Sequence, residues 1–257
     1  MNLQDKVVLI TGARRVGSHL ARLLADRGSH VALTDHTSRD VIEQTAAEVR
    51  TRGVQALAVA ADLSDAHQAE RAVDQVVNQL GRRDVLVNMA SIYRPTPFAA
   101  LSPGDFDGMI AANLAAPYHT SVASARRMLD RVPAPDGDRL VGKIITVGDC
   151  ATDRPGTGYL PYLVAKGALT TMTLALAAEL APHVAVNLVQ PAMIEPPPDH
   201  SPRQIADRVA ASPLRRAGTP ADLNNLILYL LEGTDFVTGA CYRVDGGQTT
   251  IRPSYKS

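Results

Sequence analysis

Short hydrophobic runs alternate with longer amphipathic stretches along the whole chain of 257 residues. The first run, residues 7–10, contains only Val, Leu and Ile, which is typical of a strand buried on both faces of a parallel sheet. Apolar residues at helical spacing follow in residues 17–27. The same order recurs and predicts strands at residues 7–10, 30–33, 56–61, 84–87, 143–148, 185–189 and 240–244. We therefore expect one α/β domain over residues 1–257, a doubly wound parallel sheet of about seven strands with helices on both faces.

The helices expected between these strands carry recognisable start signals. Pro161 and Pro220 each suit a first helical position, with Thr219 as the N-cap of the second helix. A long helical stretch from residue 105 to residue 131 is interrupted by Pro117. The proline-rich segment 191–213 is expected to form a mobile lid over the substrate, because loops in such a position usually decide specificity.

Charge and cysteine content exclude several classes of protein. Lys plus Arg and Asp plus Glu both number 26, so nothing favours a nucleic acid or an anionic membrane as partner. Two cysteines, Cys150 and Cys241, are too few for a disulfide scaffold, and the histidines lack the spacing of metal ligands, so no metal is expected. The apolar run near the N-terminus is too short for a signal peptide or a membrane span, which predicts a soluble cytoplasmic protein.

A glycine turn joins the first strand to the first helix and is a candidate pyrophosphate site. Thr11-Gly12-Ala13-Arg14-Arg15-Val16-Gly17 lies where backbone N–H groups and the helix dipole favour a phosphate. Asp35 follows the second strand, where a carboxylate binds ribose hydroxyls and favours NAD(H). Arg14 could hold a 2′-phosphate and favours NADP(H), and Asp35 could also be a plain turn residue. Asp62, beside Leu63, could reach the adenine or could cap the next helix with Ser64.

Tyr162 and Lys166 are candidates for proton transfer. They are four residues apart, so a helix that starts at Pro161 presents both on one face. A neighbouring ammonium is expected to lower the pKa of the tyrosine, which could then pass a proton as a hydride arrives at the adjacent carbon. Taken alone, the pair is better explained as two ordinary residues of an amphipathic helix, and the proton-transfer interpretation depends on motifs elsewhere in the chain.

Several motifs together resemble the short-chain dehydrogenase/reductase family along essentially the full chain. They are the turn Thr11 to Gly17, one residue short, Asp62-Leu63, Asn88-Met89-Ala90-Ser91, Asn113, the Tyr162 and Lys166 pair, and Asn187 to Ala192. The resemblance implies a Rossmann fold, an NAD(P)H cofactor, a small-molecule substrate and a homotetramer or homodimer. It makes Asp149, Tyr162, Lys166 and Asn113 catalytic, with Asn113 linking the lysine to solvent through a water. It assigns cofactor contacts to Gly12, Arg14, Arg15, Val16, Gly17, Asp35, Asp62, Leu63, Asn88, Ala90, Lys166, Pro191 and Ile194.

Asp149 departs from the serine that the family usually carries at the end of the fifth strand. In this it is similar to pteridine and dihydromonapterin reductases, as are Arg15-Val16-Gly17, residues 88–97, the polar insertion 133–138 and the ending 236–247. That resemblance gives the substrate contacts to Ser91, Tyr93, Arg15, Asp149 and Tyr162, with Tyr93 stacking on a pterin.

The chemistry of a carboxylate gives a separate reason to expect a nitrogenous substrate. An ionised Asp149 would oppose an oxygen that becomes an alkoxide, whereas the N–H groups of a pterin donate to a carboxylate. Asp149 could instead pair with a backbone N–H or with Arg154, and Tyr93 could simply close the core. Two other functions stay open, a general ketone/alcohol oxidoreductase and a catalytically silent dinucleotide-sensing protein.

Overall fold

A central parallel sheet organises the chain. The structure is a computed structural model that describes residues 1–134, 139–196 and 201–251. Its strands are β1 (Val7–Thr11), β2 (His30–Asp35), β3 (Ala56–Ala60), β4 (Val85–Asn88), β5 (Gly142–Val147), β6 (Val184–Pro191) and β7 (Cys241–Val244). They form one sheet of seven strands in the order β3-β2-β1-β4-β5-β6-β7, and the described pairs are all parallel. This confirms the predicted doubly wound sheet.

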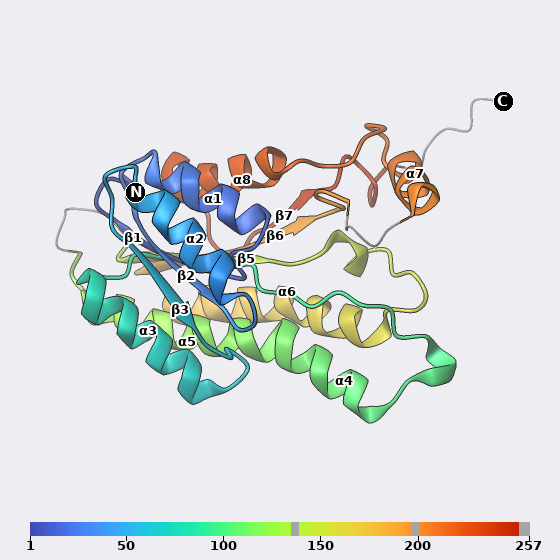
Figure 1. Ribbon diagram of the computed structural model, residues 1–257, viewed down its shortest axis with the longest axis horizontal. Helices are drawn as coiled ribbons and strands as arrows, with labels where there is room; N and C mark the ends of the chain where they lie inside the picture. Colours follow the sequence, from blue (N-terminus) through green and yellow to red (C-terminus); the bar gives the residue numbers. More distant parts are fainter. Residues whose placement is uncertain (135–138, 197–200, 252–257) are drawn as a thin grey trace.

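Helices cover both faces of the sheet (Figure 1). On one face lie α1 (Val16–Ala25), α2 (Arg39–Arg50) and α8 (Pro220–Leu228). On the other lie α3 (Ala66–Leu80), α4 (Pro103–Ile110), α5 (Ala116–Leu129) and α6 (Leu160–Leu180). The short α7 (Pro202–Ala211) stands beyond the carboxyl ends of the strands.

The alternation within β1 explains the two hydrophobic cores. Val8 and Ile10 pack with α1, α2 and α8, whereas Val7 and Leu9 pack with α3 and α5. All four side chains have no exposed surface. A strand with a core on each face needs apolar residues at every position, which is why the run is uninterrupted.

The helix expected from residue 105 to residue 131 breaks earlier than predicted. A π-helical turn, η2 (Ala111–Ala115), separates α4 from α5, and Pro117 lies directly after it in the first turn of α5. The side-chain amide of Asn113 donates to the carbonyl oxygen of Met109, four residues earlier, at 3.2 Å. Asn113 therefore lies in the π-helical turn that interrupts the helix.

Two further segments can be compared with expectation. Thr219 caps α8 in a capping box with Asp222, with Pro220 in the first turn, as predicted. Within segment 191–213 the structure places α7, capped by Ser201, and residues 197–200 lie outside the described part. Most of the polar insertion, residues 135–138, also lies outside it. The movement of a lid stays a prediction.

By length and composition, α6 is the one helix of the described chain that could cross a membrane. Its buried side carries Tyr162, Lys166 and Leu169, which suits a helix that packs against a sheet.

Candidate active site

A cavity of about 760 Å³ lies at the carboxyl ends of the strands. In a doubly wound sheet this is where ligands bind, beside the point at which the strand order reverses, here between β1 and β4. The predicted cofactor residues that line the cavity are Gly12, Arg14, Arg15, Val16, Gly17, Asp35, Asp62, Leu63, Ala90, Lys166, Pro191 and Ile194.

Asn88 is the exception among the predicted cofactor contacts. It is only 3% exposed, its amide donates to Ser121 at 3.0 Å, and its carbonyl oxygen accepts from Thr120 at 2.8 Å. The side chain of Asn88 ties β4 to α5 and does not line the cavity, so its contact with the cofactor stays a prediction.

The turn between β1 and α1 depends on a close approach of two backbones. Gly12 has a φ of 66°, and a Cβ there would lie 2.4 Å from the Cα of Ala90. Only glycine fits such a position without displacing backbone. The approach brings the N-terminus of α1 beside the end of β4 and forms one wall of the cavity.

Arg15 lies at the N-cap of α1 with a φ of 49°, a conformation that favours glycine. Its guanidinium reaches across to Glu195, donating at 3.3 Å to the carboxylate and at 2.8 Å to the backbone carbonyl. The pair links the glycine turn to the chain that follows β6, and Arg15 lines both this cavity and its neighbour.

The part of the cavity that is expected to hold the adenosine of the cofactor contains two carboxylates, Asp35 and Asp62. Oδ1 of Asp35 accepts from the backbone N–H groups of Thr37 and Ser38 at 2.9 and 2.8 Å, so Asp35 shapes a turn and also lines the cavity. Asp62 accepts from the Ser64 hydroxyl at 2.7 Å, and that bond lowers the pKa of Asp62. The cap of α3 is Asp65, so the suggested capping role of Asp62 and Ser64 is wrong.

Tyr162 and Asp149 are directly bonded. The Tyr162 hydroxyl donates to Oδ2 of Asp149 at 2.6 Å, and Oδ1 of Asp149 accepts from the N–H of Ala151 at 2.8 Å. Burial, followed by the charge of Asp149, raises the pKa of Tyr162 well above its usual value. Asp149 therefore faces Tyr162, and its suggested pairing with Arg154 does not occur, since Arg154 donates to the Gln248 carbonyl.

Lys166 does not act on the tyrosine as expected. Its side chain is buried, its Nζ donates to the Val147 carbonyl at 3.0 Å, and it lies 6.0 Å from the centre of the Tyr162 ring. Burial lowers the pKa of Lys166 itself to about 8. The prediction that the ammonium lowers the pKa of Tyr162 is wrong in this structure, because burial and Asp149 raise it.

Asn113 holds the segment that follows β4. Its Oδ1 accepts from the Ser91 hydroxyl at 2.7 Å and from the Ile92 N–H at 3.1 Å, and its amide donates to the Ile92 carbonyl at 3.0 Å. The side chain has no exposed surface and does not line the cavity. Asn113 therefore positions Ser91 and Ile92, and its catalytic role as a proton relay through a water stays a prediction.

A second cavity of about 460 Å³ adjoins the first and shares Arg15, Asp149, Tyr162, Ala192 and Ile194 with it. Tyr93 lines this second cavity and stacks on Tyr159, with ring centres 4.6 Å apart and planes 7° apart. Tyr93 is 39% exposed and meets Tyr162 edge to face at 4.9 Å, so it does not close the core. One face of Tyr93 is therefore already covered by Tyr159, a residue that was not predicted from the sequence.

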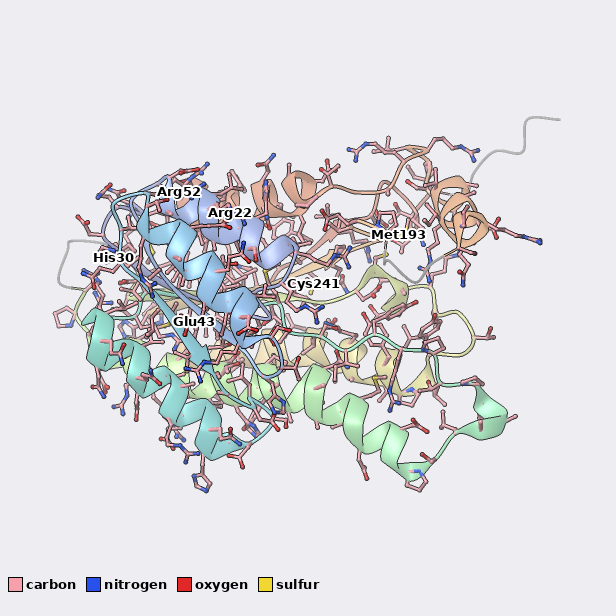
Figure 2. The ribbon with its side chains drawn as sticks, viewed as in Figure 1. Arg22, His30, Glu43, Arg52, Met193 and Cys241 are labelled. Carbon is pink, nitrogen blue, oxygen red and sulfur yellow. The ribbon has the colours of Figure 1, made fainter. Side chains whose placement is uncertain are left out.

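Met193, labelled in Figure 2, follows β6 toward α7 and contributes to this cavity. Arg208 of α7 donates to the Tyr93 hydroxyl at 2.9 Å. Tyr159 and Arg208 were not among the residues predicted from the sequence. The three-residue spacing of Tyr159 and Tyr162 is a signal that could have found the first, but no local pattern marks the second.

Among the described residues, no group of three His, Cys, Asp or Glu side chains could hold a metal ion. Cys150 lies next to Asp149 in the second cavity, and burial raises the pKa of its thiol to about 12. It is therefore a poor nucleophile at neutral pH.

Comparison with known proteins agrees with this geometry. A family model described as Enoyl-(Acyl carrier protein) reductase matches residues 12–249. A cyclohexanol dehydrogenase of Rhodococcus sp. (strain TK6) is 36% identical over an alignment of 270 residues. The alignment covers 96% of this chain and 97% of that protein. The chain belongs to the short-chain dehydrogenase/reductase family.

Solved structures of this family superpose on nearly the whole chain. A double mutant of a Serratia marcescens short-chain dehydrogenase/reductase matches with a TM-score of 0.87 at 31% identity, covering 97% of this chain and 100% of that one. A Burkholderia cenocepacia short chain dehydrogenase in complex with NADP matches with a TM-score of 0.87 at 29% identity, covering 96% and 99%. The chain is therefore an NAD(P)-dependent oxidoreductase.

The cavity fits a dinucleotide. Glycine at position 12 permits the close turn, the N-terminus of the ten-residue helix α1 borders the space, and Asp35, Arg14 and Lys166 offer polar groups along it. When bound, the nicotinamide supplies or accepts a hydride.

Proposed function

We propose that this short-chain dehydrogenase/reductase reduces a nitrogen-containing ring, with a pterin or dihydropterin as the candidate substrate. The observation that carries the proposal is the 2.6 Å hydrogen bond from the Tyr162 hydroxyl to Asp149. The substrate would occupy the second cavity, beside Tyr162 and Tyr93.

The carboxylate favours a substrate that brings its own N–H donors. A carbonyl oxygen that gains negative charge next to Asp149 would be repelled, whereas an amine or ring N–H would be bound. Asp149 keeps one oxygen on the Ala151 N–H, which leaves the other to exchange Tyr162 for a substrate donor.

Tyr162 would serve as the acid. Its raised pKa keeps the phenol protonated at neutral pH, so it holds a proton for the ring nitrogen next to the carbon that is reduced. A C=N double bond then becomes a C–N single bond that has gained a hydride on carbon and a proton on nitrogen. Arg15, which lines both cavities, and Ser91, which lines the adjoining first cavity, are proposed as further contacts to the substrate. Ser91 is held in place by Asn113.

The second candidate is a ketone/alcohol oxidoreductase of the same family. The cyclohexanol dehydrogenase relative favours it, and the stacking of Tyr93 on Tyr159 leaves less free aromatic surface for a pterin. In this alternative Asp149 would have to be protonated when the carbonyl binds.

The assay that separates the two uses oxidation of NADPH and NADH as the readout. Dihydrobiopterin, dihydromonapterin and cyclohexanone are each offered over a range of concentrations. Turnover of a dihydropterin supports the proposal. Turnover of cyclohexanone alone overturns it in favour of the second candidate.

A homo-oligomer and a cytoplasmic location are also proposed. Exposed apolar side chains along α4, α5 and α6, among them Phe106, Tyr118 and Leu174, offer a surface for a second copy. Both cysteines are free thiols, which suits a reducing compartment.

A further inference from the structure

The wall of the second cavity contains more positive than negative charge. Three arginines, Arg15, Arg154 and Arg208, line it together with Asp149 and Glu195. Arg15 is paired with Glu195 at 3.3 Å, which leaves two arginines to be accounted for.

Neither of the two remaining arginines has an anionic partner among the residues that the structure describes. Arg154 donates to the backbone carbonyl of Gln248 at 3.4 Å, and Arg208 donates to the hydroxyl of Tyr93 at 2.9 Å. Both partners are neutral oxygens. A guanidinium binds a carboxylate or a phosphate more strongly than a neutral oxygen, so both arginines can improve their hydrogen bonds when an anion arrives.

The cavity wall combines a carboxylate with two cationic side chains. Asp149 is bonded to Tyr162 and favours a donor. Arg154 lies in the loop that follows η3 (Cys150–Thr152), and Arg208 lies on α7, so two separate segments supply the positive charge. The Tyr93 and Tyr159 rings lie in the wall of the same cavity, and Arg208 bonds to one of them.

We infer that the substrate carries an anionic oxygen group, a carboxylate or a phosphate, which Arg154 and Arg208 bind while its reacting ring lies beside Tyr162 and Asp149. The inference rests on the proposed function only in that the second cavity holds the substrate. It does not require that the ring be a pterin.

The test uses three flat probes of the same bicyclic shape, 2-naphthoate, 2-naphthyl phosphate and the neutral 2-naphthamide. Their dissociation constants are measured by calorimetry on the full chain, with and without NADPH. The proteins are the wild type, Arg154→Gln, Arg208→Gln and the double variant. Arg203→Gln is the matched control, because Arg203 is exposed on the same helix as Arg208 and does not line the cavity.

We expect at least one anionic probe to bind about ten-fold or more tightly than naphthamide. Each single variant should lose most of that preference, the double variant all of it, and Arg203→Gln none. The tighter of the two anions identifies carboxylate or phosphate as the natural group. Equal binding of naphthamide, a preference that survives in the double variant, or no binding of any probe overturns the inference.

Failure of the proposed function gives a different result. If the arginine variants lose the preference for anionic probes but no dihydropterin is reduced, the pterin proposal is wrong and the inferred anionic substituent is supported. If dihydropterins are reduced while the arginine variants bind the probes as the wild type does, the pterin proposal is supported and the inferred anionic substituent is wrong.

Discussion

The Tyr162 hydroxyl donates to Oδ2 of Asp149 at 2.6 Å, which places a carboxylate where it opposes ionisation of the phenol. Burial of Tyr162 acts in the same direction, and together they raise its pKa well above the usual value. A tyrosine in this state is a proton donor rather than a base at neutral pH. The arrangement therefore suits Tyr162 to the role of proton donor in the proposed reduction.

Replacing Asp149 by Asn should move the alkaline limit of the reductive reaction. Removing the charge lowers the pKa of Tyr162, and a donor acid is active only while protonated, so the rate should fall at a lower pH than in the wild type. For a substrate with N–H donors, kcat/KM should also fall by about ten-fold or more below that limit. The measurement is the pH profile of reduction.

Asp153→Asn is the control for this variant. Asp153 is close in sequence, but its carboxylate pairs with Arg243 at 2.5 Å and does not contact Tyr162. Its profile should follow that of the wild type. An unchanged alkaline limit in Asp149→Asn would show that Asp149 does not control the tyrosine.

Replacing Tyr162 by Phe separates an enzyme from a dinucleotide-sensing protein. Loss of the donor should lower kcat by about 10³-fold, while the affinity for nucleotide, measured by titration, should remain. Tyr159→Phe removes a hydroxyl from the same cavity but keeps the ring that stacks on Tyr93, so its effect should be far smaller. Turnover that Tyr162→Phe leaves intact would contradict the assignment of Tyr162 as the acid.

Lys166 makes stability depend on pH. Its pKa is about 8 in the folded protein and near the ordinary value of 10.5 in the unfolded chain. Between these values the unfolded state binds more protons, so the free energy of unfolding should rise with pH. From pH 8 to 9.5 the gain of the wild type relative to Lys166→Met should be about 2 kcal/mol.

Denaturant titrations of both proteins at pH 7, 8, 9 and 9.5 measure this difference. Below pH 8 the two curves should run parallel, because Lys166 is then protonated in both states. Parallel curves over the whole range would mean that Lys166 remains charged in the fold.

The sequence allowed the sheet and the place of the site to be predicted for a physical reason. Strands such as β1 are buried on both faces, so their apolar runs are unbroken, and parallel strands bring their carboxyl ends to one edge. Gly12 and Asp35 could therefore be assigned to one cavity from their positions, whereas Tyr162, which lies on α6, was assigned through its resemblance to the family.

Side-chain partners could not be predicted in the same way. Asn88 and Asn113 both suit a polar site, but only the packing of α5 shows that Asn88 bonds to Thr120 and Ser121. The pKa of Tyr162 depends on burial, which a helical spacing does not reveal. Arg208 reaches Tyr93 across 115 positions of sequence, a contact that depends on where α7 lies.

Two glycines with left-handed backbone provide a test of the cofactor turn. Gly12→Ala and Gly53→Ala introduce the same backbone strain, since φ is 66° and 82°. A Cβ at position 53 meets no atom within 4 Å, whereas one at position 12 lies 2.4 Å from the Ala90 Cα. We expect Gly53→Ala to cost about 1 kcal/mol and Gly12→Ala roughly 2 kcal/mol more.

The measurement is urea unfolding, followed by titration with NADPH and NADH. Gly12→Ala should also weaken nucleotide binding, because the displaced turn forms a wall of the cavity. Similar losses for the two variants would mean that the approach of Gly12 to Ala90 is not required.

Asp35 and Arg14 should set the cofactor preference in opposite directions. Asp35 opposes a 2′-phosphate, and Asp35→Asn keeps the Oδ1 acceptor for the Thr37 and Ser38 N–H groups, so the turn is preserved. This variant should raise the ratio of kcat/KM for NADPH to that for NADH by about ten-fold. Arg14 lines the same cavity, and within the described residues it forms no ion pair, so Arg14→Gln should lower the ratio by a similar factor.

The exposed Arg126 of α5 lies outside the cavity, and Arg126→Gln should leave the ratio unchanged. The double variant distinguishes two arrangements. If Asp35 and Arg14 act on the phosphate independently, their effects on the ratio cancel, because interactions of separate groups with one ligand add as free energies. If only one variant changes the ratio, the other residue does not face the 2′ position, and the preference is decided by the remaining one alone.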